Sequence, residues 1–156
     1  GLGQLKSVGL KNRQLAIFCL SCIIICMPET INETPRILLV EDDQFLSMLL
    51  KNRLEREGGF AIMLARSGDE ALKLLAEFRP HLILLDVILP GKTGFEVLEE
   101  MQKLPGERPP VIIISNLGQD IDIERGRSLG VIDYFVKART STDEIVEKIR
   151  ALFVRE

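Results

Sequence analysis

The stretch that decides the fold reads HLILLDVILPGKTG and runs from His81 to Gly94. Four apolar residues, Leu82 to Leu85, lead directly into a single carboxylate, Asp86. A run that is apolar on both faces is typical of a central parallel strand, because helices cover both sides of such a strand. An acid at its carboxyl end lies where open α/β sheets carry their chemistry. Asp86 taken alone is equally compatible with the start of a turn.

From Arg36 onward, strand and helix patterns alternate on both sides of this stretch. The predicted strands are Ile37–Val40, Phe60–Ala65, Leu82–Leu85, Val111–Ile114 and Ile132–Val136. The predicted helices cover residues 44–57, 69–78, 95–104 and 121–129, and a last helix, capped by Ser141 or Thr142, runs through Leu152. Five such units predict an α/β fold: a doubly wound, five-stranded parallel sheet flanked by five helices, three layers deep.

Two helices carry finer local patterns. In the first helix, the side chains expected to face the core are Phe45, Met48, Leu49 and Leu54. Asp43 is expected to be its N-cap rather than a metal ligand. Ser67 and Glu70 have the spacing of a capping box at the start of the second helix.

The composition points to one domain with a buried core. The chain has 156 residues, of which 46% are hydrophobic and only 5% aromatic, which is typical of an aliphatic α/β domain. The first 26 residues hold three basic side chains and no acid, so all 23 acidic residues lie in the remainder. A mildly acidic domain lacks the basic footprint of a nucleic-acid binder, and we expect no direct binding to DNA or RNA.

The first 34 residues do not follow the strand and helix pattern. Leu15 to Met27 is apolar except for Ser21. It is shorter than the roughly 20 residues of a membrane-spanning helix, and closer in length to the core of a signal peptide. Met27 begins a polar lead of ordinary length into the first strand. We therefore expect residues 1–34 to be a non-domain leader, with residues 1–26 arising from an over-extended gene model, and residues 35–156 to be the domain. A membrane anchor is the second interpretation.

All three cysteines lie in this leader, at Cys19, Cys22 and Cys26. Their spacing could suggest a metal or cluster site, but no fourth ligand lies near, so we expect none. The rest of the chain has no cysteine and therefore no disulfide, which suits a reducing, cytoplasmic location. The only histidine, His81, stands before the central strand without a catalytic partner and is expected to be an exposed polar residue.

Four of the five predicted strands finish in a charged or hydroxyl residue. The first strand is followed by Glu41 and Asp42, the third by Asp86, the fourth by Ser115 and the fifth by Lys137. In a parallel sheet these ends meet at one edge, where three carboxylates would repel one another. A hard divalent cation such as Mg²⁺ relieves that repulsion, while a lysine and a hydroxyl suit a group with several anionic oxygens. The pattern predicts a phosphoryl group on or near Asp86.

Four segments in this order and at these separations resemble the receiver domains of two-component response regulators, which have a flavodoxin-like fold. The segments are ILLVEDD at Ile37–Asp43, LILLDVILPGKTG at Leu82–Gly94, VIIISN at Val111–Asn116 and DYFVK at Asp133–Lys137. The resemblance extends over about residues 36–153. Because the chain stops after the last predicted helix, we expect the stand-alone type without an output domain.

The resemblance implies that Asp86 accepts a phosphoryl group from a histidine kinase or a phosphotransfer protein. Asp42 and Asp86 would ligate Mg²⁺ directly, Glu41 would act through water, and the Ile88 carbonyl would be a backbone ligand. The domain would not be an enzyme in the ordinary sense, because it would catalyse only its own phosphorylation and slow dephosphorylation.

The resemblance also assigns the residues that sense the phosphoryl group. Ser115 would bond a phosphoryl oxygen and Lys137 would pair with it. Tyr134 would be the switch residue that turns inward when the Ser115 hydroxyl moves, although an ordinary half-buried strand residue is the alternative. The surface formed by the fourth helix, fifth strand and last helix would bind a downstream protein or a second copy of the chain.

Two departures from the family pattern bear on the site. Receiver domains usually have proline after the lysine of the fifth strand, and this chain has Ala138. Since a cis bond is costly before a residue other than proline, we expect the Lys137–Ala138 bond to be trans. In the family, the side chains two positions after the phosphorylated Asp and two positions after the Ser/Thr help to place the water that attacks the phosphoryl group. This chain has Ile88 and Leu117 there. Because these apolar side chains cannot hydrogen-bond to water, we expect slow self-dephosphorylation.

Three other classes of protein fit the sequence less well. A phosphatase of the haloacid-dehalogenase type needs a second acid two residues after the nucleophile, where this chain has Ile88. An inactive, receiver-like interaction module would be expected to lack an acid, the lysine or the phosphoacceptor, and all are present. A nucleotide-binding domain is disfavoured because no G-x-G-x-x-G follows the first strand.

Overall fold

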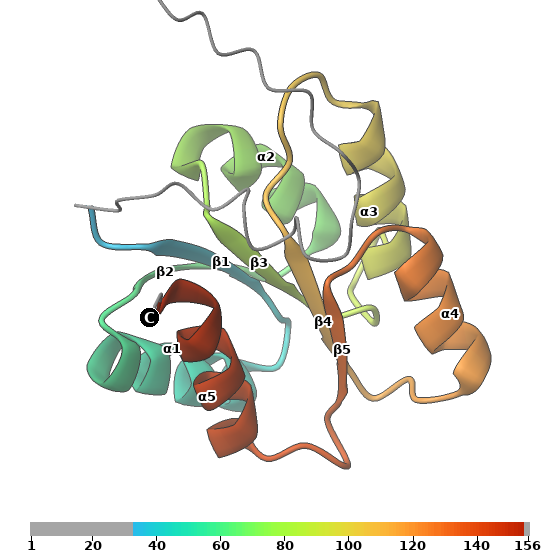
Figure 1. The fold of residues 1–156 in the computed structure, drawn as a ribbon. Helices are drawn as coiled ribbons and strands as arrows, with labels where there is room; N and C mark the ends of the chain where they lie inside the picture. The colour runs from blue at the N-terminus through green and yellow to red at the C-terminus, as the bar shows by residue number, and fades with distance from the viewer. Residues whose placement is uncertain (1–32, 155–156) are drawn as a thin grey trace, which may run out of the picture.

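The computed structural model describes residues 33–154 and shows one parallel sheet of five strands in the order β2-β1-β3-β4-β5 (Figure 1). The strands are β1 (Arg36–Val40), β2 (Ala61–Ala65), β3 (Leu82–Leu85), β4 (Val111–Ser115) and β5 (Asp133–Val136). The helices are α1 (Gln44–Gly58), α2 (Gly68–Phe78), α3 (Gly94–Lys103), α4 (Asp120–Ser128) and α5 (Thr142–Phe153). The predicted fold class is confirmed, and each predicted strand lies within one residue of its observed bounds.

The central strand is β3, because its apolar run is buried on both sides. All four of its residues are buried, and it pairs with β1 on one side and β4 on the other. Helices α1 and α5 cover one face of the sheet, and α2, α3 and α4 cover the other (Figure 1). The helices that follow β1 and β3 lie on opposite faces of the sheet. The place between two such strands is where open α/β sheets hold their functional groups.

Helix α1 shows a different buried face from the predicted one. Phe45 is 80% exposed and Met48 is 44% exposed, whereas Ser47, Leu50 and Leu54 are buried. A buried serine is tolerated here because its hydroxyl donates a hydrogen bond to the Gln44 carbonyl, at 3.1 Å. The buried positions have helical spacing, so the prediction identified the right element but the wrong rotation: Leu54 is buried as predicted, Leu49 is partly exposed, and Phe45 and Met48 lie outside.

Helix starts are set mainly by side-chain caps. Asp43 accepts a hydrogen bond from the Leu46 amide, which confirms it as the N-cap of α1. Ser67 caps α2 as predicted, but the Glu70 carboxylate bonds the amide of Arg66 instead of that of Ser67, so the predicted capping box is incomplete. Complete boxes begin α3, at Thr93 with Glu96, and α5, at Ser141 with Glu144.

Two further expectations concern the backbone and the leader. No cis peptide bond occurs among residues 33–154, so the Lys137–Ala138 bond is trans as predicted. Within the same residues, no helix combines the length and apolar character that a membrane crossing requires. The expectations for Met27 and the apolar stretch before it, and most of the proposed 1–34 leader, lie outside the described residues.

Candidate functional site

The carboxyl ends of β1 and β3 bring three carboxylates together at one edge of the sheet. Glu41, Asp42 and Asp86 each offer an oxygen atom, and these oxygens lie within 4.8 Å of one another. Glu41 is only 2% exposed and Asp86 only 4%, while Asp42 is exposed. The predicted clustering of these acids is therefore present, with two of the three removed from solvent.

The Lys137 ammonium lies between the two buried acids. Its Nζ is 2.6 Å from Glu41 Oε2 and 2.6 Å from Asp86 Oδ2. The lysine follows β5, and its backbone amide donates to the Ser115 carbonyl at 2.9 Å, which fixes where the side chain begins. Burial lowers the pKa of Lys137, but the hydrogen bonds and charges of Asp86 and Glu41 outweigh it, so the net pKa is raised. The lysine therefore stays charged at neutral pH.

The site raises the pKa of the buried Glu41. Burial raises its pKa above the ordinary value, and the neighbouring charge of Asp86 raises it further, while Lys137 opposes both. Glu41 Oε1 also accepts a hydrogen bond from the Asp43 amide at 3.2 Å. Its ionised form is therefore less favourable in the folded protein than in water.

The backbone around Asp86 is held from two directions. Asp86 Oδ1 accepts a hydrogen bond from the Ile88 amide at 3.1 Å, and the Gly94 amide donates to the Val87 carbonyl at 2.8 Å. A Cβ atom on Gly94 would lie 2.3 Å from the Asp86 carbonyl oxygen. Only glycine fits at this position, because α3 begins in direct contact with the backbone of Asp86.

Ser115 and Tyr134 converge on one backbone segment. Ser115 is fully buried, and its Oγ accepts a hydrogen bond from the Leu117 amide at 3.3 Å. The Tyr134 hydroxyl donates to the Leu117 carbonyl at 2.7 Å, and the ring packs against Gly126 of α4. Burial raises the pKa of Tyr134, so the phenol stays protonated and remains a donor.

The donor set at this edge fits a hard divalent cation. Carboxylate oxygens and backbone carbonyls are the ligands that Mg²⁺, Mn²⁺ and Ca²⁺ prefer. Glu41, Asp42 and Asp86 supply more negative charge than the Lys137 ammonium neutralises. The residues present therefore suit a divalent metal beside an anionic ligand.

Sequence reasoning placed the charged side chains at the site but missed the groups that orient them. The Ile88 amide, the Leu117 carbonyl and the close contact at Gly94 are backbone features, which strand-end patterns do not reveal. His81 differs from expectation, since it is half-buried and its Nδ1 accepts a hydrogen bond from the Arg36 amide at 2.9 Å.

Comparison with known proteins identifies the family. The profile of the response regulator receiver domain matches residues 37–150, which is most of the chain and includes every residue of the site. The chain belongs to this family.

The receiver domain is similar to the phosphate regulon transcriptional regulatory protein PhoB of Rhizobium meliloti, with 38% identity over 78% of this chain and 53% of that protein. It is 42% identical to AfsQ1 of Streptomyces coelicolor, over 66% of this chain and 44% of that protein. The chain thus spans about half the length of these curated relatives.

Solved receiver domains share the fold of this one. The BeF3-activated receiver domain of Klebsiella pneumoniae RstA superposes with a TM-score of 0.67 at 26% identity, covering 77% of this chain and 99% of that one. The receiver domain of the Francisella response regulator 1452 gives a TM-score of 0.70 at 29% identity, covering 77% and 97%. The Mn²⁺-bound form of response regulator Rcp1 gives 0.67 at 31% identity, covering 78% and 95%. Receiver domains bind a divalent metal, in agreement with the acidic cluster of this chain.

The strained Glu41 carboxylate predicts that removing its charge stabilises the metal-free protein. The folded-state pKa of Glu41 is raised, so its contribution to stability is present below the unfolded pKa near 4.5 and is lost as the pH rises through the folded-state pKa. Glu41→Gln should therefore raise the free energy of unfolding at about pH 7 by on the order of 1 kcal/mol, and this gain should vanish near pH 4.

Urea denaturation in EDTA at both pH values measures this difference. Glu77→Gln, an exposed acid on α2, is the matched control and should change little at either pH. A loss of stability for Glu41→Gln at neutral pH would contradict the prediction.

Proposed function

We propose that this receiver domain accepts a phosphoryl group on Asp86 from a histidine kinase or a phosphotransfer protein. The observation that carries the proposal is the surrounding of the Asp86 carboxylate, with the Ile88 amide on Oδ1 and the Lys137 ammonium on Oδ2. A carboxylate oxygen attacks phosphorus as the bond to the donor histidine breaks, and the freed imidazole takes up a proton. Because phosphoryl transfer leaves the protein little covalent chemistry to do, positioning and neutralisation of the developing charge supply most of the catalysis.

The metal that we propose for the acidic cluster is Mg²⁺. Asp42 and Asp86 would bind it directly, Glu41 through water, and the Ile88 carbonyl would complete the protein's contribution. A cation held there would supply positive charge to the oxygens of the transferring group. The residues of the chain hold the carboxylates together and keep Lys137 beside them, where it is ready to pair with an added phosphoryl oxygen.

We further propose that the domain acts as a signalling module and not as an enzyme on other substrates. Its only reactions would be its own phosphorylation and a slow loss of the phosphoryl group. Ile88 is 53% exposed beside the phosphoacceptor, and this apolar side chain can neither act as a general acid nor hold a water molecule. The position thus argues against a phosphatase of the haloacid-dehalogenase type.

The switch that we propose runs from Ser115 through Leu117 to Tyr134. Both side chains already bond the same backbone segment, so movement of the Ser115 hydroxyl toward a phosphoryl group would change what holds Tyr134. Tyr134 contacts α4 at Gly126, and α4 is tied to α3 by Arg125, which stacks 4.5 Å above the Phe95 ring. The face made by α4, β5 and α5 is therefore the proposed surface for a downstream protein or a second copy of the chain, operating by population shift. We propose a cytoplasmic location and no direct contact with nucleic acid.

Phosphorylation in vitro tests the central proposal. Incubation with acetyl phosphate and Mg²⁺ should add one phosphoryl group by intact mass, and Asp86→Asn should abolish the adduct because the attacking carboxylate is gone. Asp43→Asn is the matched control, because asparagine is as good an N-cap as aspartate and Asp43 is not among the proposed ligands. An adduct that persists in Asp86→Asn would overturn the assignment.

The apolar Ile88 side chain predicts a long-lived phosphoryl group. Ile88→Asn should shorten the half-life of the phosphorylated protein by roughly tenfold. The reason is that the asparagine amide can position the water that attacks the phosphoryl group, and a positioning group of this kind speeds a reaction. The loss of phosphate after removal of acetyl phosphate measures it. Ile121→Asn changes another exposed isoleucine, on α4, and should leave the half-life unaltered. An unchanged half-life in Ile88→Asn would refute this explanation.

The exposed apolar surface at the start of α1 points to the docking of a phosphodonor protein. Phe45 and Met48 project into solvent from α1, which begins two residues after Asp42, so a protein that delivers a phosphoryl group to Asp86 would cover them. Large exposed apolar side chains next to a functional site are characteristic of interaction surfaces.

Phe45→Ala should therefore slow phosphorylation by a phosphorylated histidine phosphotransfer protein by about fivefold or more, since truncation of an interface residue that contributes to binding costs more than about 1 kcal/mol. Phosphorylation by acetyl phosphate should proceed at the wild-type rate, because this small donor does not dock on the surface of α1. Val154→Ala, at an exposed apolar residue just after α5, is the control. Equal slowing with both donors would show that Phe45 acts on the site and not on docking.

A further inference from the structure

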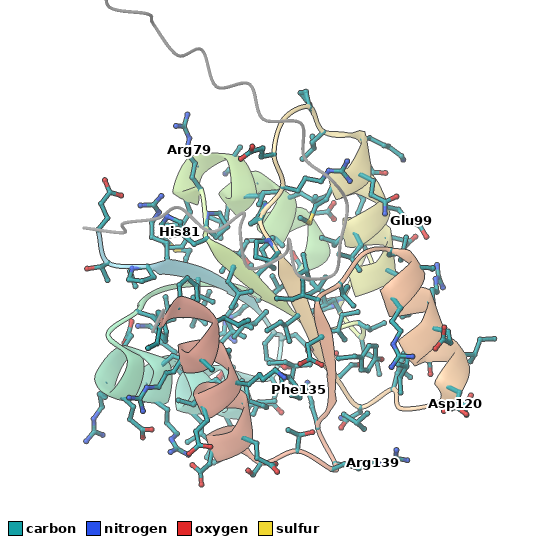
Figure 2. The ribbon with its side chains drawn as sticks, in the orientation of Figure 1. Arg79, His81, Glu99, Asp120, Phe135 and Arg139 are labelled. Atoms are coloured by element: carbon teal, nitrogen blue, oxygen red, sulfur yellow. The ribbon has the colours of Figure 1, made fainter. Side chains whose placement is uncertain are left out.

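His81 joins the amino-terminal ends of β1 and β3, at the end of the sheet opposite to the acidic cluster. The His81 amide donates to the Arg36 carbonyl at 2.7 Å, and the Arg36 amide donates to the imidazole Nδ1 at 2.9 Å. The imidazole thus replaces the backbone carbonyl that a longer ladder would have offered. Figure 2 shows His81 and Arg79 at one end of the molecule and Arg139, in the loop after β5, at the other.

This hydrogen bond requires the neutral imidazole. Nδ1 can accept the Arg36 amide hydrogen only when it carries no proton itself, so the neutral ring holds its proton on Nε2. Protonation would place two N–H groups opposite each other. The half-buried Arg36 amide would then lose its acceptor, and an unsatisfied donor of this kind is costly.

Arg36 connects this contact to the rest of the structure. Its guanidinium Nε donates to the Phe78 and Arg79 carbonyls, both at 3.1 Å, and so binds the carboxyl-terminal end of α2. Its Nη1 forms an ion pair with Glu33 at 3.0 Å, in the segment that leads into β1. A change at His81 would therefore reach the incoming segment, β1 and the end of α2 together.

The charges around His81 oppose its protonation. Burial lowers the pKa of His81, the Arg36 guanidinium lowers it further, and Glu33 raises it. A cavity of about 570 Å³ beside the ring is lined by Arg79 from the end of α2 and by Glu107 and Arg108 from the loop before β4. Phe153 of α5 also lines this cavity and carries no charge. Around His81, three arginines, Arg36, Arg79 and Arg108, thus stand against two acids, Glu33 and Glu107.

We propose that His81 is a pH-sensitive fastening between β1 and β3, which holds while the imidazole is neutral and is released when the imidazole takes up a proton. The fastening is independent of phosphorylation at Asp86. Because the unfolded chain binds the proton more readily, the stabilisation is present above about pH 6.5 and is lost as the pH falls toward the folded-state pKa of His81. Acidification would loosen the chain before β1 and the end of α2 first.

Titration by NMR tests the fastening directly, since the chain has a single histidine and its ring signals need no further assignment. The untagged full chain should show an imidazole pKa below the ordinary value, and ¹⁵N shifts should show the neutral ring protonated on Nε2. A pKa at or above the ordinary value, or a neutral ring protonated on Nδ1, would overturn the proposal.

Denaturation of three proteins provides a second, independent measurement. His81→Asn keeps an acceptor oxygen near the Nδ1 position without titrating, and His81→Leu has no acceptor at any pH. As the pH falls from about 7.5 to 5.5, the ratio of the wild-type folding constant to that of His81→Asn should fall about threefold or more. The ratio of the wild-type folding constant to that of His81→Leu should fall by the same factor. A constant ratio of wild type to His81→Asn would overturn the proposal. Phosphorylation by acetyl phosphate at neutral pH should be the same in wild type and His81→Asn, which separates this inference from the proposed function.

Discussion

The arrangement of this receiver domain depends on one buried ion cluster, in which the Lys137 ammonium contacts both Glu41 and Asp86. Without that cation, two almost fully buried carboxylates would lie together with no opposite charge beside them, which is costly in an apolar interior. The cluster is nevertheless a source of strain, because Glu41 keeps a raised pKa even with the lysine beside it. Strain of this kind is common at functional sites, where charge is concentrated for a ligand that the protein alone does not neutralise.

The sheet order makes the cluster possible. β3 lies between β1 and β4, so the residues that follow β1 and β3 are neighbours although they are more than forty positions apart in the sequence. Lys137 follows β5, which lies two strands from β3 and three from β1. It reaches the acids with its long side chain, whose start is fixed by the hydrogen bond between its amide and the Ser115 carbonyl. The apolar residues of β3 hold this geometry, since both faces of the strand are covered by helices.

The sequence was sufficient to predict the fold and the acidic edge, because both follow from apolar periodicity and from where parallel strands end. It was not sufficient to predict the rotation of α1, because Ser47 lies inside by bonding its own helix while Phe45 lies outside. It also failed for His81, whose partner is a backbone amide forty-five positions away. Contacts of side chains with distant backbone groups leave no periodic trace in a single sequence, and the same limit applies to the orienting groups around Asp86.

The contact between Gly94 and the Asp86 carbonyl has a mechanical consequence. Helix α3 begins at Gly94, whose backbone contacts the backbone of Asp86 directly, with no side chain between them. A translation of α3 along its axis would therefore move Asp86 away from Glu41 and Lys137. We therefore expect α3 to move together with Asp86, whereas Gly126 of α4 meets only the side chains of Ile113 and Tyr134.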